Sequence, residues 1–260
     1  MSSNTIFALT LSFLAGISTI IGAIMVFFSN NKNDKIITFA LVFSAGVMIC
    51  VSFTDLFPSA QKMIVSCYGH ISGLIITMFY MLCGMIFALL IDKFIPKEND
   101  LNYSSGNEGH YSLFRVGVVT MIAITLHNFP EGIATFISGY QDTTLGISIT
   151  IAIAMHNIPE GIAVAMPIYY STGSKANAFK YALLSGLSEP FGALMAFLVL
   201  KPFINEFLLG LIFAFVMGIM LYISFEELIP SSRKYGYTDL SLFSIFLGIL
   251  IMPFSHILMG

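Results

Sequence analysis

Eight long apolar stretches separated by polar residues constrain the fold of this chain more than any other feature of its sequence. The stretches are residues 5–29, 37–59, 71–95, 116–139, 146–169, 177–200, 205–230 and 240–258. A helix needs about 20 apolar residues to cross a bilayer core of ~30 Å. The stretches are continuous rather than alternating, which favours helices over the strands of a membrane barrel. We therefore expect an all-α polytopic membrane protein with eight transmembrane helices.

The composition supports a lipid environment and limits the classes of partner. Hydrophobic residues make up 57% of the 260 residues and charged residues only 10%, whereas soluble domains carry roughly 25% charged residues. So few charges could not cover the apolar surface of a soluble protein of this size. We expect one transmembrane domain, residues 1–260, with the lipid bilayer around it. The net charge of −3, without a basic run, argues against nucleic acid as a partner.

The distribution of Lys and Arg predicts how the helices are oriented in the membrane. The loops after the odd-numbered helices hold nine of these residues, and the opposite side holds only Lys62 and Lys201. Positively charged loops stay in the cytoplasm. We therefore expect a multi-pass protein of the cell membrane with both termini extracytoplasmic. The long polar stretch 96–115 is then a cytoplasmic loop, and the helices follow a 3+2+3 order around the central pair 116–139 and 146–169.

Three carboxylates lie where lipid should exclude them. Glu131, Glu160 and Glu189 fall near the middles of the fourth, fifth and sixth spans. Placing an ionisable group at that depth costs at least ~2.5–3.5 kcal/mol. None of the eleven Lys and Arg residues lies near the centre of a span. The carboxylates are therefore either protonated or neutralised by a bound cation.

The surroundings of two of these glutamates are repeated. Residues 127–132 read His-Asn-Phe-Pro-Glu-Gly, and residues 156–161 read His-Asn-Ile-Pro-Glu-Gly. His and Glu are four residues apart, so in a helix they share a face, with Asn on its flank. Both histidines lie roughly 21–22 Å from the turn near Gln141, at 1.5 Å per residue. Two antiparallel helices therefore bring both copies together near the midplane.

The motif also contains a proline in each copy. Pro130 and Pro159 each remove one backbone donor and clash with the carbonyl four residues earlier, which frees the carbonyls of Leu126 and Met155. We therefore expect the fourth and fifth helices to be broken at these prolines. The sixth helix repeats the arrangement in reduced form at 188–190, Ser-Glu-Pro.

The residue types indicate metal-ion chemistry. Two His nitrogens with two Glu oxygens suit Zn²⁺, whereas Asn and Glu oxygens suit harder ions such as Mn²⁺ or Fe²⁺. Three shared carboxylates allow two adjacent cations, and a methionine near the middle of the second helix could add a soft sulfur or be plain core. The candidate metal ligands are His127, Asn128, Glu131, His156, Asn157, Glu160, Glu189 and Met48.

The doubled His-Asn-x-Pro-Glu-Gly motif resembles the hallmark of the ZIP (Zrt-, Irt-like) metal-transporter family, and above all its bacterial ZupT-type branch. The resemblance covers essentially the whole chain, from the eight spans to the Ser-Glu-Pro of the sixth. It implies uptake of zinc, and also of iron and manganese ions, into the cytoplasm through a binuclear intramembrane site. Family members commonly carry a His-rich cytoplasmic loop, whereas 96–115 holds only His110.

The resemblance also implies two ligand sets that share the glutamates of the central helix pair. One set comprises His127, Glu131, His156 and Glu160, with Met48 as an optional fifth ligand. The other comprises Asn128, Glu131, Asn157, Glu160 and Glu189. The metal ions are then cargo bound in transit, and no cofactor is expected.

Two other functions compete with metal transport. An intramembrane metalloprotease would carry a His-Glu-x-x-His signature, and the sequence contains none. A proton-coupled carrier of a small organic substrate would use the glutamates as proton relays, but it calls for a larger cavity with aromatic or basic contacts. We therefore expect a transporter and no enzyme. The sequence leaves open a homodimer and whether certain polar residues line the pathway, namely Asp55, His70, Glu226 and Glu227.

Overall fold

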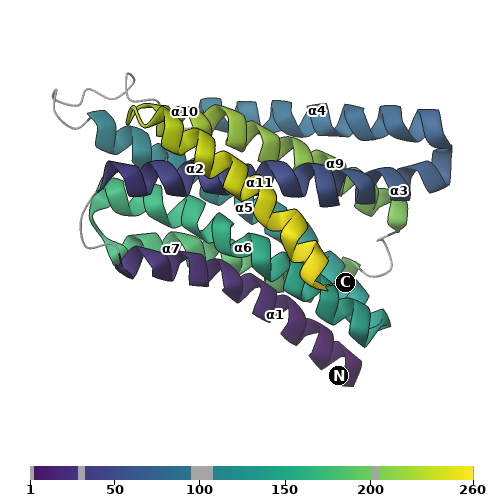
Figure 1. Ribbon diagram of the computed structural model, residues 1–260. Coiled ribbons are helices and arrows are strands. Elements are labelled where there is room, and N and C mark those ends of the chain that lie inside the picture. Colours follow the sequence, from purple (N-terminus) through teal and green to yellow (C-terminus); the bar gives the residue numbers. More distant parts are fainter. Residues whose placement is uncertain (1–2, 29–32, 95–107, 201–204, 260) are drawn as a thin grey trace.

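The computed structural model describes residues 3–28, 33–94, 108–200 and 205–259, and the regular elements within these ranges are all helical (Figure 1). Several elements follow one another without a loop and form longer rods. In chain order the elements are α1 (Ser3–Ile24), η1 (Met25–Phe28), α2 (Asp34–Val51), η2 (Ser52–Leu56), α3 (Phe57–Tyr68), α4 (His70–Phe94), α5 (Glu108–Gln141), α6 (Thr143–Thr172), α7 (Lys175–Gly186), α8 (Ser188–Met195), η4 (Ala196–Leu200), α9 (Glu206–Tyr222), η5 (Ile223–Leu228), α10 (Ile229–Arg233) and α11 (Thr238–Met259).

These elements make up one rod for each of the eight apolar stretches. Among the described residues, seven rods are long and apolar enough to cross a membrane, and α11 contributes a shorter apolar helix, Thr238–Pro253. The prediction of an all-α polytopic membrane protein is confirmed. The rods follow the apolar stretches because only a helix satisfies every backbone polar group inside its own segment.

One segment that the sequence predicted as a loop is partly helical. Residues 95–107 lie outside the described ranges, but α5 already begins at Glu108, well before the predicted start at 116. Leu113 and Phe114 pack against the hydrophobic core, and Arg115 is paired with carboxylates of two other helices. With its charge neutralised and its apolar side chains in contact, this turn extends the helix.

Three of the described elements, η2, η4 and η5, are π-helical turns, and two of them lie next to described prolines. The rod from α2 to α3 widens at η2 just before Pro58, and the rod from α9 to α10 widens at η5 just before Pro230. A π-turn shifts the backbone register, which lets the helix continue past a residue that lacks an N–H group. The turns carry acidic residues, Asp55 in η2 and Glu226 and Glu227 in η5.

The expectation that the fourth and fifth helices are broken is wrong. Both α5 and α6 are continuous α-helices through Pro130 and Pro159. The backbone of each helix packs closely on a neighbouring helix just after the proline. A Cβ atom added to Gly132 would lie 1.8 Å from the carbonyl oxygen of Glu189, and one added to Gly161 would lie 1.8 Å from that of Thr19. Because glycine has no side chain, Gly132 allows α5 to pack closely on α8, and Gly161 allows α6 to pack closely on α1.

The helices form two groups that meet along α2 and α6. In one group α1 and α5 pack on α6, and α7 and α8 cover them; in the other, α11 packs on α2, and α3 and α4 pack on α9. Figure 1 shows α1 and α4 at opposite edges of the molecule. The three helices that carry the intramembrane glutamates, α5, α6 and α8, therefore all belong to the first group.

Candidate metal centre

The structure brings seven of the eight candidate ligands together in the interior. Helix α5 supplies His127, Asn128 and Glu131, helix α6 supplies the matching His156, Asn157 and Glu160, and α8 supplies Glu189. All seven side chains are buried. The four-residue spacing places His and Glu of each copy on one helix face, and the antiparallel pair α5–α6 turns these faces toward each other.

The two histidines converge on one carboxylate. The Nε2 atoms of His127 and His156 each lie 3.1 Å from the Oε1 atom of Glu131. The Nε2 atom of His127 also lies 3.4 Å from Oε1 of Glu160, and the two imidazole centroids are 6.0 Å apart. One ligand atom from each of His127, Glu131 and His156 can be chosen so that all lie within 4.8 Å of one another.

Hydrogen bonds satisfy only part of this cluster: Nε2 of His156 is hydrogen-bonded to the carboxylate of Glu131, whereas other atoms have no hydrogen-bond partner. Although Nε2 of His127 is close to two carboxylate oxygens, it is buried and not aligned for a hydrogen bond, and the same holds for Oε1 of Glu160. A buried polar atom without a hydrogen bond costs free energy. A divalent cation resolves this cost, because it binds nitrogen and oxygen lone pairs that point at one position.

A second group of acceptors lies beside the first. The amide nitrogen of Asn157 donates to Oε2 of Glu189 at 2.9 Å and to the carbonyl oxygen of Ala15 at 3.0 Å. Oδ1 of Asn157 and Oε1 of Glu189 remain buried without hydrogen-bond partners. These oxygens are suited to a harder cation than the two imidazoles are.

Asn128 completes this oxygen-rich set. With its amide nitrogen toward Glu160, Asn128 donates to Oε2 of Glu160 and to the carbonyl oxygen of Ile124, both at 3.2 Å. In the reverse orientation the amide nitrogen lies 3.4 Å from the carbonyl oxygen of Ser185. The first orientation gives the amide nitrogen two acceptors and connects Asn128 to the carboxylate that approaches His127. The reverse orientation turns the amide oxygen toward Glu160, and it is the orientation in which Asn128 and Glu160 could bind one cation.

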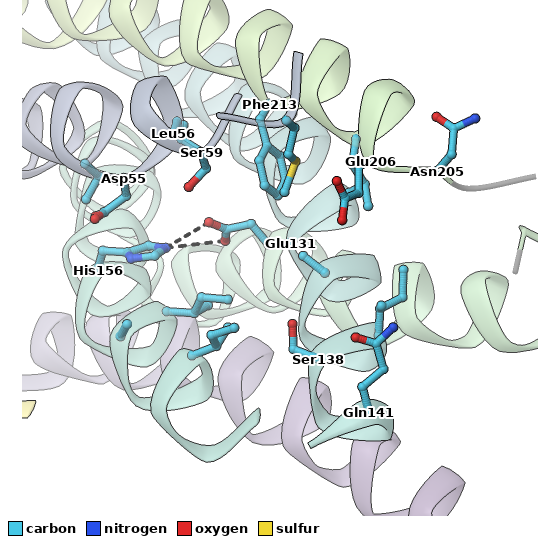
Figure 2. Close-up of a pocket in the computed structure, with 18 residues that line it drawn as sticks. Asp55, Leu56, Ser59, Glu131, Ser138, Gln141, His156, Asn205, Glu206 and Phe213 are labelled. Atoms are coloured by element: carbon cyan, nitrogen blue, oxygen red, sulfur yellow. Dashed lines mark hydrogen bonds and ion pairs between the residues drawn. The ribbon is translucent and has the colours of Figure 1, made fainter. Parts of the chain in front are cut away.

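A cavity of about 550 Å³ leads to this cluster from one end of the molecule. Figure 2 shows Glu131 and His156 facing each other at its inner part, while Gln141 and Glu206 lie farther out. Gln141 is ten residues beyond Glu131 on α5, which corresponds to about 15 Å of helix. Asp55 lines the wall as well, so the cavity carries acidic groups along its length. Such a cavity favours cations over anions.

The remaining candidates lie elsewhere. Met48 is buried within the hydrophobic core on α2, so its role as a sulfur ligand stays a prediction. His70 is exposed at the first residue of α4. Glu226 and Glu227 line a separate polar cavity of about 210 Å³ around η5, which does not share a lining residue with the first cavity.

Sequence reasoning missed an ion-pair network at this second cavity. Arg115 donates to Oε1 of Glu227 at 3.1 Å and to the side chain and backbone of Asp92, while Tyr222 donates to Asp92 at 3.3 Å. Glu227 therefore pairs with Arg115, and Lys234, the other basic residue at this cavity, instead donates to Ser112. The available signal was Asp92, an acidic residue within the apolar stretch 71–95.

Comparison with known proteins places the chain in a family. The profile of the family described as ZIP Zinc transporter matches residues 97–256. Proteins named "Zinc transporter ZupT" are 44% identical in Lysinibacillus sphaericus over the full length of both chains, and 44% identical in Streptococcus mutans over 99% of each. The namesake from Campylobacter jejuni is 41% identical over 97% of this chain and 96% of its own. These relatives are transporters and not enzymes, which removes the intramembrane metalloprotease. The chain belongs to the ZIP zinc transporter family.

Proposed function

We propose that this protein carries zinc ions, and also iron and manganese ions, across the cell membrane into the cytoplasm. The observation that supports the proposal best is the convergence of His127, Glu131, His156 and Glu160 at the inner end of an acidic cavity. The name of the relatives supports zinc as cargo. If the cluster had only a structural role, hydrogen-bond donors would be expected to satisfy its buried nitrogen and oxygen lone pairs.

The charge distribution supports the orientation that uptake requires. The cavity opens where Gln141, Asn205 and Glu206 lie, at the α5–α6 turn and the start of α9. The loops rich in Lys and Arg lie at the opposite ends of the helices. By the positive-inside rule the cavity faces the outside and both termini are extracytoplasmic. An ion therefore enters from outside and reaches Glu131 and His156 first.

Two cation positions account for the ligands best. The first uses the imidazoles of His127 and His156 with Glu131 and Glu160, and it suits zinc. The second uses oxygens of Asn128, Asn157 and Glu189 together with the same two glutamates, and it suits manganese and iron. Glu131 and Glu160 bridge the two positions. The side-chain ligands replace the water molecules bound to the ion one after another. The free-energy cost of dehydration is therefore offset at each step.

Uptake of radioactive zinc into vesicles that contain the purified protein tests the proposal. The variants Glu131→Gln and Glu160→Gln keep the side-chain shape but remove the charge, and we expect each to lose zinc uptake. Asp239→Asn is the matched control, because it removes an exposed carboxylate at the start of α11, away from the site. Uptake at the wild-type rate in both glutamate variants would end the proposal. The assay measures the movement of zinc alone, so neither proteolysis nor uptake of an organic solute would produce a signal.

A further inference from the structure

A second large cavity lies outside the metal centre, between the two helix groups. Its volume is about 530 Å³, and its twelve lining side chains come from η1, α2, α6 and α11 and are all apolar. Figure 1 shows α11 crossing in front of α2 and α6 on this side of the molecule. We refer to it as the α2–α6 groove. The transport pathway does not use it, since none of its lining residues lines the acidic cavity.

The groove has an open rim and a buried floor. At the rim Met25 is 54% exposed and Ile36 is 41% exposed, whereas on the floor Ala40 is 4% exposed and Met166 is 3% exposed. The surrounding helices are long enough and apolar enough to cross a membrane. The medium at the rim is therefore hydrocarbon, and the groove offers no polar partner that would hold water.

We propose that the α2–α6 groove binds one acyl chain of a phospholipid. The stretch of α6 that lines it runs from Met155 to Met166, a rise of eleven residue steps or about 16 Å of helix, which matches the reach of an acyl chain into one leaflet. The groove ends near the midplane at Met155 and opens toward the start of α2 at Ile36. In the orientation proposed above, this is the cytoplasmic leaflet.

A basic side chain stands at the open end of the groove. Lys35 directly precedes Ile36, is exposed, and holds its Nζ atom 5.7 Å from the ring centroid of Tyr237. Its ammonium group can contact the phosphate of a lipid whose chain enters at Ile36. Asp34 is exposed beside it, so we expect only a modest preference for lipids with a net negative charge.

The bound chain packs directly behind the metal centre. Two lining residues of α6, Met155 and Pro159, immediately precede the candidate ligands His156 and Glu160. Ser44 on α2 donates to the carbonyl oxygen of Pro159 at 2.7 Å. The groove thus lies at the contact between α2 and α6, where the two helix groups meet, and the acyl chain fills the space beside that contact.

The absence of tryptophan from the sequence allows a direct test of binding that does not depend on transport. Phe43→Trp places the sole tryptophan in the groove, and Phe79→Trp places it on the lipid-exposed face of α4 as a control. Both variants are reconstituted in vesicles with increasing fractions of phosphatidylcholine that carries bromine on its acyl chains. We expect bromine to quench both tryptophans. Quenching of Phe79→Trp without quenching of Phe43→Trp would overturn the proposal.

A groove-filling substitution separates a bound chain from ordinary lipid contact. Ala40→Leu adds volume to the floor, so we expect it to reduce quenching of Phe43→Trp at least twofold and to leave Phe79→Trp unchanged. The Phe79→Trp reading also shows that α4 of the variant is still inserted in the membrane. If Ala40→Leu leaves the quenching of Phe43→Trp unchanged, the tryptophan senses bulk lipid and the proposed site is wrong.

The headgroup contact has its own measurement. Brominated phosphatidylglycerol should quench Phe43→Trp at about half the mole fraction that brominated phosphatidylcholine needs, given the weak attraction of one partly compensated Lys. Lys35→Gln should remove the difference, and Lys62→Gln, on the opposite side of the membrane by the charge distribution, should not. A preference that survives Lys35→Gln would exclude Lys35 as the phosphate contact.

Discussion

Glu131 is central to the metal centre because both histidines approach the same oxygen of its carboxylate. His127 lies on its own helix and His156 on the neighbouring one, so this single side chain connects α5 to α6. In a ligand shell, removal of either imidazole leaves oxygen donors behind. The nitrogen donors therefore control which metals the site prefers, more than whether it binds metal at all.

We expect His156→Ala to lower zinc uptake by about tenfold relative to manganese uptake, the effect of losing roughly 1.4 kcal/mol of nitrogen coordination. Asn157→Ala is the matched control on the next residue, since it removes an oxygen donor and should lower manganese uptake more than zinc uptake. Competition between the two ions in vesicle uptake measures both ratios. An equal loss for both metals in His156→Ala would contradict the assignment of separate nitrogen and oxygen positions.

Much of the site at this scale follows from local spacing. The four-residue step from His to Glu and the equal distance of both copies from the turn near Gln141 fix their face and depth, and the structure brings these residues together. The sequence does not predict which side chains pair between helices that are far apart in the chain. Arg115 and Glu227 are 112 residues apart, and no local pattern reports which of several basic residues meets a given carboxylate.

At the scale of helices, close backbone contact between α5 and α8 positions Glu189 beside the central pair. The carbonyl oxygen of Glu189 occupies the space that a Cβ atom at Gly132 would need. Any side chain at this position must separate the helices. The consequence reaches the site directly, since Glu189 then moves away from Asn157.

Gly132→Ala should therefore destabilise the protein by about 1–3 kcal/mol and reduce metal uptake. Gly139→Ala on the same helix is the control. There the nearest atom to a new Cβ is the end of the Leu11 side chain at 3.0 Å, which can shift. Thermal unfolding in detergent compares the two variants, and equal midpoints would show that α5 and α8 are not held together at Gly132.

A buried ion-pair network connects α4, α5 and η5 at the other end of the molecule. Arg115 is 12% exposed and lies between Asp92 and Glu227. Arg115→Leu leaves both carboxylates without their cation, and we expect a loss of about 3–5 kcal/mol in stability. The triple variant with Asp92→Asn and Glu227→Gln should recover most of the loss. Thermal unfolding in detergent measures both, and a triple variant no more stable than Arg115→Leu would contradict the charge explanation.

The sequence predicts helices better than it predicts their irregularities. Length and continuous hydrophobicity are sufficient for eight rods, because lipid leaves the backbone few alternatives. We attribute the π-turns η2 and η5, and the continuity of α5 and α6 past Pro130 and Pro159, to contacts with neighbouring helices. Local proline chemistry alone therefore predicted breaks where tertiary packing maintains continuous helices.

At the scale of the whole molecule, the two ends of the helix assembly differ in charge and in access to the metal centre. The acidic cavity reaches Glu131 and His156 from one end, while the paired carboxylates around Arg115 lie in a separate cavity. The two cavities share no lining residue, so in this conformation the acidic cavity gives access to the metal centre from one end. Lipid in the α2–α6 groove would then lie where the two helix groups must adjust to each other.

Labelling of single cysteines in intact cells tests this arrangement. In a chain whose Cys50, Cys67 and Cys83 are replaced by serine, Ser138→Cys lines the acidic cavity and Lys234→Cys lies at the opposite end. We expect a maleimide that cannot cross membranes to label Ser138→Cys from outside, and Lys234→Cys only after the cells are opened.

The same labelling is then repeated in the presence of zinc. A zinc ion held between Glu131 and His156 brings positive charge and bound water into the inner part of the cavity. Labelling of Ser138→Cys should therefore slow when zinc is added, and the Glu131→Gln variant should lose this protection while it keeps basal labelling. If Lys234→Cys reacts in intact cells and Ser138→Cys does not, the molecule has the opposite orientation, and an ion entering the acidic cavity would be leaving the cytoplasm.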